Sequence, residues 1–211
     1  MQAGRKSSWT VAAAFLAAAF FCAPAMAQAP KPGAAAQRES VKGIDNFAQV
    51  SSMLYRGAQP SDGAYASLKQ MGINVVVDFR NEKDEIAREK KAVEAAGMQF
   101  LSLPFSGRGE PTHDEVVSFL NLMHDPQGKK VFVHCRQGRD RTGMMVALYR
   151  LTFDHWTVDN AIAEMHDFHY HAFFLPGLAR YVRDYPAHLS SDPTLAAMLL
   201  PVATATATTV R

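Results

Sequence analysis

The stretch VHCRQGRDRTG, residues 133–143, joins two apolar segments of the chain. The segment before it, KVFV at residues 130–133, is typical of a short buried strand, and residues 143–149 after it are typical of a buried helix. A tight loop between a strand and a helix N-terminus gathers backbone N–H groups, and the helix dipole favours negative charge there. We therefore expect residues 133–143 to form an anion-binding loop.

Two side chains determine the chemistry of this loop. Cys135 stands at its start and Arg141 six positions later, so the five residues between them can curl into a cup. Gly138 at mid-loop permits backbone angles that a side chain would forbid. Inward-pointing amides, the helix dipole and a nearby guanidinium stabilise a thiolate, which predicts a pKa for Cys135 below the ~8.5 of a free thiol. Because Arg141 can bind two phosphate oxygens at once, the pattern favours nucleophilic attack on phosphorus.

The pattern His134-Cys135-x5-Arg141-Thr142 resembles the signature of the cysteine-dependent protein tyrosine phosphatase superfamily. Its extended form HCxxGxxRTG, residues 134–143, resembles the dual-specificity branch. The segment YRGAQP, residues 55–60, is similar to an N-terminal segment of bacterial and fungal dual-specificity-like phosphatases, where it packs beside the active site. The resemblance implies a phosphoric monoester hydrolase that needs no cofactor and no metal. It also leaves Arg56 two roles, a contact with phosphate or a structural ion pair.

The same resemblance assigns a role to each residue of the signature. Cys135 would form a phosphocysteine intermediate, and Arg141 would bind the phosphate and the transition state. Thr142 would donate its hydroxyl to the sulfur and help it leave, whereas His134 would hold the shape of the loop and lower the thiol pKa. The other loop residues would bind substrate: Arg136, Gln137, Gly138, Arg139 and Gly143.

The general acid is the point at which the chain departs from this pattern. The family places an aspartate on a separate loop before the cysteine, but the corresponding stretch here, PFSGRGEP at residues 104–111, contains none. Asp140 is one candidate, because CxxGxDRT resembles lipid-phosphatase branches in which this aspartate acts as acid; otherwise it orients the loop or pairs with an arginine. Asp114 is a second candidate, or else a first-turn carboxylate that complements a helix dipole. Glu110 on the loop itself is a third.

Two substrate classes remain open. Arg136 and Arg139 flank the cup, and basic residues at these positions resemble phosphatases that act on phosphoinositides or inositol phosphates. Phosphotyrosine on a protein would instead need a deep site with an aromatic wall, for which Tyr55, Phe105 and Phe173 are candidates unless they belong to the core. The formal net charge of +2 does not suggest a nucleic-acid partner.

The first residues have the form of a secretory signal. Arg5 and Lys6 precede an apolar run, and Ala25-Met26-Ala27 is a small-x-small cleavage site, which predicts cleavage after about Ala27. The run is shorter than the ~20 residues of a membrane span, so we expect a periplasmic or secreted protein without stable membrane insertion after cleavage. Cys135 would then be the only cysteine, which favours a catalytic role and predicts sensitivity to oxidation.

The remaining chain divides into three parts. We expect a disordered linker at residues 28–43, one phosphatase domain at 44–190 and a C-terminal tail at 191–211, after the signal peptide at 1–27. Alternating strand and helix patterns across the domain predict an α/β sandwich, in which a mostly parallel sheet is flanked by helices. The active loop would lie at the carboxyl edge of a strand, where such sheets bind ligands.

The sequence has features of three other kinds of protein or site. His166, His169 and His171 have spacings that suggest a metal site, but no HExxH motif or cysteine accompanies them, so we expect surface or core histidines. A rhodanese-like sulfurtransferase also uses a C-x5-R loop, although the Arg141-Thr142-Gly143 ending argues against it. A secreted pseudophosphatase, which would bind a phosphorylated partner without turnover, is consistent with the missing loop aspartate.

Overall fold

The structure is a computed structural model that describes residues 33–200. The predicted signal peptide lies outside this range. Six strands form one sheet in the order β1-β2-β3-β6-β4-β5. The strands are β1 Gln37–Arg38, β2 Ala48–Gln49, β3 Leu54–Ala58, β4 Ile73–Asp78, β5 Gln99–Ser102 and β6 Lys130–Cys135.

The strand that precedes the signature loop lies inside the sheet. β6 pairs in parallel with β3 on one side and with β4 on the other, and β4 pairs in parallel with β5. Only the pairs β1–β2 and β2–β3 are antiparallel among the strands of the described chain. The prediction of a mostly parallel sheet is therefore confirmed, and Cys135 stands at the carboxyl end of a strand that is hydrogen-bonded on both edges.

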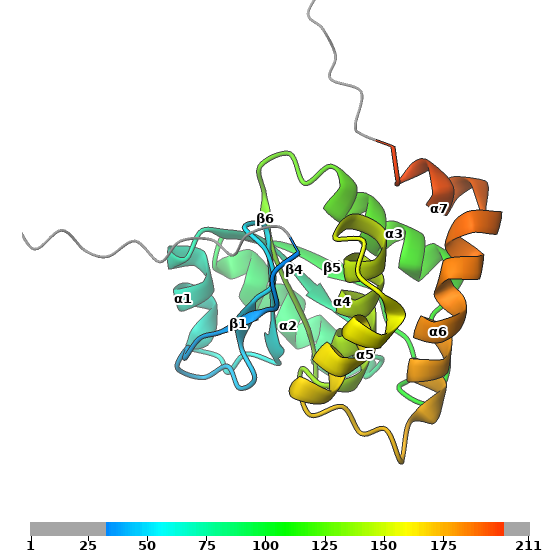
Figure 1. Ribbon diagram of the computed structural model, residues 1–211. Helices are drawn as coiled ribbons and strands as arrows, with labels where there is room; N and C mark the ends of the chain where they lie inside the picture. The colour runs from blue at the N-terminus through cyan, green and yellow to red at the C-terminus, as the bar shows by residue number, and fades with distance from the viewer. Residues whose placement is uncertain (1–32, 201–211) are drawn as a thin grey trace, which may run out of the picture.

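Helices cover both faces of the sheet (Figure 1). Alternation along the strands separates two cores: Val131 and Val133 of β6 face one core, and Phe132 faces the other. The Phe132 face is covered by α1 Ala64–Gln70 and α2 Lys83–Ala95. The opposite face is covered by α3 His113–His124, α4 Asp140–Phe153, α5 Val158–Asp167, α6 Pro176–Ser191 and α7 Pro193–Ala197. This layering confirms the predicted α/β sandwich.

Helix α3 shows how local sequence fixes an element. The Thr112 hydroxyl accepts a hydrogen bond from the Glu115 N–H, and the Glu115 carboxylate accepts one from the Thr112 N–H, which completes a capping box. Helix α4 differs, because it is buried along nearly its whole length and has no side-chain cap. Its first turn is therefore held by the loop that carries the signature.

Order extends beyond the predicted domain limits on both sides. β1 lies within the stretch predicted as a linker, where Arg38 donates to the side chain of Asn46 and its guanidinium stacks on the Phe168 ring at 4.3 Å. At the other end, α6 continues to Ser191 and α7 lies within the predicted tail, because Leu195 and Met198 enter the core. Residues 28–32 of the linker and 201–211 of the tail lie outside the described part. None of the helices in residues 33–200 combines the length and the apolar character that a bilayer crossing would require.

Candidate active site

The signature loop starts where β6 ends and leads directly into α4. Cys135, opposite Ala58 of β3 in the parallel pairing, is 3% exposed. Gly138 has a φ of +66°, and a Cβ built on it would lie 2.3 Å from the carbonyl carbon of Gly57. Only glycine allows both this left-handed backbone and so close an approach to β3. The glycine therefore lets the loop close against the sheet.

Hydrogen bonds and charge stabilise a thiolate at Cys135. Burial in itself raises the pKa of this thiol, but the hydroxyl and N–H of Thr142, the charge of Arg141 and the N–H of Gln137 lower it, and the net pKa lies below its ordinary value. The Thr142 hydroxyl is fully buried and, within residues 33–200, has no hydrogen-bond partner other than this sulfur. A thiol with a lowered pKa ionises more readily, and the thiolate is the reactive form of a cysteine.

The guanidinium of Arg141 joins two loops at the carboxyl edge of the sheet. Its Nη1 donates to the carbonyl oxygen of Phe79 at 3.1 Å, after β4, and to that of Phe105 at 3.2 Å, after β5. A longer contact of 3.4 Å reaches the side chain of Asn81. One nitrogen makes all three of these contacts, and within residues 33–200 no hydrogen bond is made by Nη2 or Nε, so both can donate to a phosphate. Arg141 therefore has the position and the free donors that its predicted role needs.

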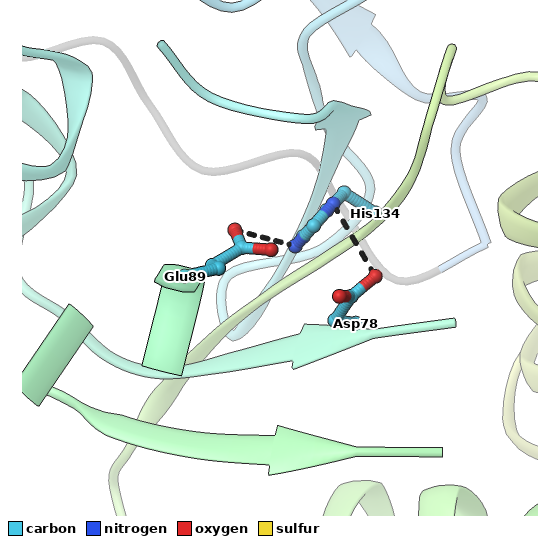
Figure 2. Close-up of side chains that lie close together, drawn as sticks. All are labelled: Asp78, Glu89 and His134. Atoms are coloured by element: carbon cyan, nitrogen blue, oxygen red, sulfur yellow. Dashed lines mark ion pairs between the residues drawn. The ribbon is translucent and has the colours of Figure 1, made fainter. Parts of the chain in front are cut away.

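His134, at the start of the signature loop, contacts Glu89 of α2 (Figure 2). Its Nε2 lies 3.0 Å from Glu89, and its Nδ1 lies 3.2 Å from the carbonyl oxygen of Cys135 and 3.9 Å from Asp78. Burial by itself lowers the pKa of this imidazole, but the hydrogen bond and charge of Glu89 and the charge of Asp78 raise it overall. His134 therefore links Glu89 of α2 to the backbone carbonyl of Cys135 in the interior of the protein.

Asp78, Glu89 and His134 also have the donor atoms of a metal site, since one ligand atom from each lies within 4.8 Å of the others. However, Arg80 donates to both oxygens of Asp78 and also contacts Oε2 of Glu89. Tyr65 donates at 2.9 Å to Oε1 of Glu89, the oxygen that His134 also contacts. With a guanidinium already neutralising both carboxylates, the cluster is better interpreted as a buried ion network that holds β4, β6 and α2 together.

Arg56 lies beneath the loop rather than at its mouth. Its side chain is fully buried, its Nη2 donates to the carbonyl oxygen of Gly138 at 2.9 Å, and its guanidinium lies 3.8 Å from the centre of the Phe168 ring. Burial lowers its pKa to about 10, although Glu164 and Cys135 oppose this change. Of the two roles expected from the sequence, the structure supports neither in full: Arg56 is a structural cation, and its partners are a carbonyl and an aromatic ring.

Asp140, the first residue of α4, is bound to a residue that the sequence did not single out for this site. Its Oδ1 accepts the backbone N–H of His171 at 2.8 Å, and its Oδ2 lies 3.1 Å from Nδ1 of the same histidine. The other ring nitrogen, Nε2, lies 3.2 Å from Nη1 of Arg139. The two partners are 31 positions apart in sequence, so only the fold reveals the contact.

A family model described as "DSP-PTPase phosphatase fused to NAD+ Kinase" matches residues 30–171, well over half of the chain. The chain belongs to this phosphatase family. The dual specificity protein phosphatase TpbA of Pseudomonas aeruginosa strain UCBPP-PA14 is 28% identical over 140 residues, which are 66% of this chain and 62% of TpbA. TpbA of a second strain is 30% identical over 121 residues, 57% of this chain and 53% of that protein. The chain thus matches less than two thirds of the length of these relatives.

Solved structures agree with this membership of the phosphatase family. The crystal structure of P. aeruginosa TpbA superposes with a TM-score of 0.63 and 27% identity, covering 79% of this chain and 97% of that one. A second TpbA structure, in complex with phosphotyrosine, has a TM-score of 0.62. A more distant relative by sequence is inositol diphosphatase DSP3 of Arabidopsis thaliana, 23% identical over 123 residues, which are 56% of this chain and 60% of DSP3.

The other two candidates for the family's general acid lie in more open surroundings than Asp140. The carboxylate of Asp140 is 15% exposed, whereas that of Asp114, in the first turn of α3, is 98% exposed and lies 3.5 Å from His113. Glu110 is exposed on the loop before α3, and within residues 33–200 it makes no hydrogen bond or ion pair with a neighbour. Of the three, Asp140 alone belongs to the phosphate-binding loop and its helix.

The loop residues that were predicted to bind substrate lie in different surroundings in the structure. Arg136 is exposed and pairs with Glu85 at 3.0 Å and with Glu82 at 3.7 Å. Gly143 is buried in α4, and its N–H donates to the carbonyl oxygen of Arg139, so this N–H is not free to bind a phosphate. Gln137 is exposed at the turn of the loop, and its N–H points at the Cys135 sulfur.

A basic cavity opens beside the loop. It has a volume of about 340 Å³ and is lined by Arg38, Asp45, Asn46, Ala58, Arg136, Gln137, Arg139 and His169. The candidate aromatic residues do not form a common wall, because Tyr55 and Phe105 are buried in the core whereas Phe173 is 88% exposed. The surroundings of the loop are therefore basic and open, and they do not form the deep aromatic site that phosphotyrosine was expected to need.

Proposed function

We propose that the protein hydrolyses phosphate monoesters by cysteine-dependent catalysis through a phosphocysteine intermediate. The observation that carries this proposal is the thiol of Cys135, whose pKa is lowered by Thr142 and Arg141 at the carboxyl end of β6. A thiolate that faces the amides of a helix N-terminus and an arginine is suited to attack phosphorus in a bound dianion. Membership of the phosphatase family supports the same chemistry.

The reaction would proceed in two displacements. In the first, the Cys135 sulfur bonds to phosphorus, the ester P–O bond breaks, and the leaving oxygen takes a proton from a general acid. In the second, water attacks phosphorus, its proton returns to the same carboxylate, and the sulfur leaves with its charge stabilised by the Thr142 hydroxyl. Arg141 would bind two equatorial oxygens throughout, where charge develops in the transition state.

We assign the general acid to Asp140. A general acid must reach the leaving oxygen within hydrogen-bond distance, so it has to stand at the rim of the phosphate site. Asp140 directly precedes Arg141 and is mostly shielded from solvent. Asp114, with its carboxylate almost fully exposed, would first need to move toward the loop. The substitution Asp140→Asn should therefore slow turnover of phenyl phosphate by about 10²–10⁴-fold, and Asp114→Asn should leave it nearly unchanged.

Two substrate classes fit the site, and the basic cavity favours one of them. TpbA binds phosphotyrosine in one of its crystal structures, and DSP3 is an inositol diphosphatase. We propose a broad phosphomonoesterase that prefers polyphosphorylated substrates, such as inositol phosphates or phosphoinositide headgroups, because additional phosphates could enter the cavity beside Arg38, Arg136 and Arg139.

Two substitutions test this preference at arginine side chains that line the cavity, and they leave Cys135, Arg141 and Thr142 unchanged. Arg38→Ala and Arg136→Ala should raise KM for a polyphosphorylated inositol by more than tenfold and change KM for para-nitrophenyl phosphate little. Arg88→Ala, an exposed arginine on α2, is the matched control. Equal losses on both substrates would overturn the polyanion preference and leave the phosphotyrosine alternative.

The function itself is tested on the purified protein with para-nitrophenyl phosphate, EDTA and a reductant. Activity that is lost in Cys135→Ser supports the cysteine mechanism, and activity that survives the substitution overturns it. If neither form turns over any ester, but the protein binds a phosphopeptide, it is a pseudophosphatase. Sulfur transfer from thiosulfate to cyanide would identify the rhodanese-like alternative.

We also propose that the protein is exported and acts in the periplasm or outside the cell. The basic start, the apolar run and the small-x-small site before residue 28 support this proposal. Mass spectrometry of the protein from periplasmic and culture fractions should give a chain that begins near Gln28. A full-length chain found only in the cytoplasm would contradict it.

A further inference from the structure

The loop between α5 and α6 lies against the signature loop through His171. Residues 169–175 cross from one helix to the other at the lower edge of the view in Figure 1. Three contacts are made by this one histidine: its N–H and its Nδ1 reach the two oxygens of Asp140, and its Nε2 reaches Arg139. Both oxygens of the carboxylate that we assign as general acid are thus bound to a single residue outside the signature.

These contacts determine which ring nitrogen carries the proton. A guanidinium can only donate hydrogen bonds, so Nε2 of His171 must accept from Arg139. In the neutral imidazole the proton then lies on Nδ1, which donates to Asp140 Oδ2. Asp140 and Arg139 are the charged groups that face the ring; in the described range no further ion pair or hydrogen bond reaches its nitrogens. Arg139 at Nε2 and Asp140 at Nδ1 thus both favour the neutral tautomer of His171 that carries its proton on Nδ1.

We propose that His171 is the positioning residue for Asp140 in the phosphatase reaction. Asp140 stands in the first turn of α4 and has no other side-chain partner among residues 33–200. Without the imidazole of His171 only the hydrogen bond from the backbone N–H to Oδ1 would remain, and one bond does not fix the plane of the carboxyl group. With His171, the N–H and Nδ1–H donors fix the plane of the carboxyl group, and the remaining lone pairs of both oxygens point away from the histidine.

The inference concerns only the protonation of the leaving group, and it rests on the proposed function. When the acid is poorly placed, a leaving oxygen of high basicity suffers most, because it needs the proton in the transition state. Phenyl phosphate, whose phenol has a pKa of about 10 like tyrosine, depends strongly on the acid. Para-nitrophenyl phosphate has a more acidic leaving group and depends on it less.

The test compares three substitutions at one position. Asparagine places an N–H near the position of Nδ1, glutamine places one near Nε2, and alanine places none. We expect His171→Ala and His171→Gln to lower kcat for phenyl phosphate by about 10²-fold, the cost of misplacing a catalytic group by about 1 Å. kcat for para-nitrophenyl phosphate should fall much less, and KM for either ester should change little. His171→Asn should restore most of the lost rate.

Two further variants separate positioning from a general loss of structure. In Asp140→Asn, adding His171→Ala should cause no additional loss on phenyl phosphate, because both substitutions remove the same function. His188→Ala removes an exposed histidine from α6 and should change neither ester. Urea unfolding of each variant shows which of them fold.

The outcomes distinguish the inference from the function on which it rests. Wild-type turnover that is abolished by Cys135→Ser, with equal losses on the two esters in His171→Ala, would overturn the positioning role and leave the phosphatase intact. The same conclusion follows if asparagine restores no more activity than glutamine. If the wild-type protein turns over neither ester, the proposed function fails and the role of His171 fails with it.

Discussion

Arg56 Nη2 donates a hydrogen bond over 2.9 Å to the carbonyl oxygen of Gly138, from a side chain that is fully buried. The donor belongs to β3 and the acceptor is the one left-handed residue of the signature loop. Asn46 donates to the same oxygen at 3.0 Å. The carbonyl at the middle of the phosphate-binding loop thus accepts two side-chain hydrogen bonds, and the shape of the loop depends on residues outside the signature.

Gly138→Ala should disrupt this arrangement. A left-handed conformation costs a non-glycine residue about 1–2 kcal/mol, and the new Cβ would lie 2.3 Å from the carbonyl carbon of Gly57, which cannot rotate away. The loop must shift, so we expect kcat on para-nitrophenyl phosphate to fall by about 10²-fold or more. Gly177→Ala is the control, because its Cβ in α6 would meet no atom within 4 Å. Full activity in Gly138→Ala would show that the loop does not need this conformation.

Arg56→Met removes the cation beneath the loop while it keeps most of the buried volume. The Gly138 carbonyl would lose a charged donor, and unfolding should become easier by about 1–3 kcal/mol. The thiolate of Cys135 would lose a favourable charge, since Arg56 and Cys135 stabilise each other's charged forms. We therefore expect the pKa of Cys135 to rise, which the pH dependence of iodoacetamide alkylation measures. An unchanged profile would mean that Arg56 has no electrostatic role.

The residues of the loop could be identified from sequence because they are contiguous. Cys135, Gly138 and Arg141 lie within seven positions, between a strand and a helix whose apolar patterns are clear. The alternation of strand and helix patterns along the chain likewise predicted the α/β layers, and in the structure Phe132 faces one core while Val131 and Val133 face the other. Local pattern and tertiary structure agree here, because burial on both faces requires an apolar strand.

The supporting residues could not be identified in this way. Arg56 meets Gly138 across 82 positions, and His171 meets Asp140 across 31. Neither contact leaves a local signal, and the histidines near residue 171 suggested only a weak metal motif. The sequence predicts a linker at β1 for a similar reason: Gln37–Arg38 has no apolar pattern, and its order depends on pairing with β2 and on the contact of Arg38 with Phe168.

Thr142→Val tests the hydroxyl that faces the sulfur. Valine keeps the shape of the side chain but cannot donate a hydrogen bond, so one of the causes of the lowered Cys135 pKa disappears. The pKa of the thiol should rise, and alkylation below neutral pH should become slower. Thr152→Val is the matched control in the same helix, because its hydroxyl bonds to Leu148 and Tyr185 instead. An equal pKa in both variants would contradict the assignment.

The buried pair of His134 and Glu89 should make stability depend on pH in two directions. The pKa of His134 is raised above 6.5 in the folded protein, so its stabilising contribution is complete below pH 6.5 and is lost as pH rises through the folded value. For Glu89, burial by itself raises the pKa, but His134, Arg80 and Tyr65 lower it by more than burial raises it. The pKa of Glu89 in the folded protein therefore lies below 4.5. Its contribution is therefore present above pH 4.5 and is lost as pH falls through the lower folded value.

Glu89→Gln should remove both contributions and leave the buried His134 without its charged partner in α2, whereas Arg80 would keep its ion pairs with Asp78 and Glu85. Breaking a buried pair in this way costs about 3–5 kcal/mol, so the free energy of unfolding near pH 6 should fall by that amount. The difference from wild type should narrow at alkaline pH, because wild-type His134 then loses its proton. Glu94→Gln, which removes one partner of an exposed pair with Lys90 on the same helix, should change stability little at any pH. Urea unfolding between pH 5 and about 9 measures these effects, and parallel curves for wild type and Glu89→Gln would show that His134 is not the titrating partner of Glu89.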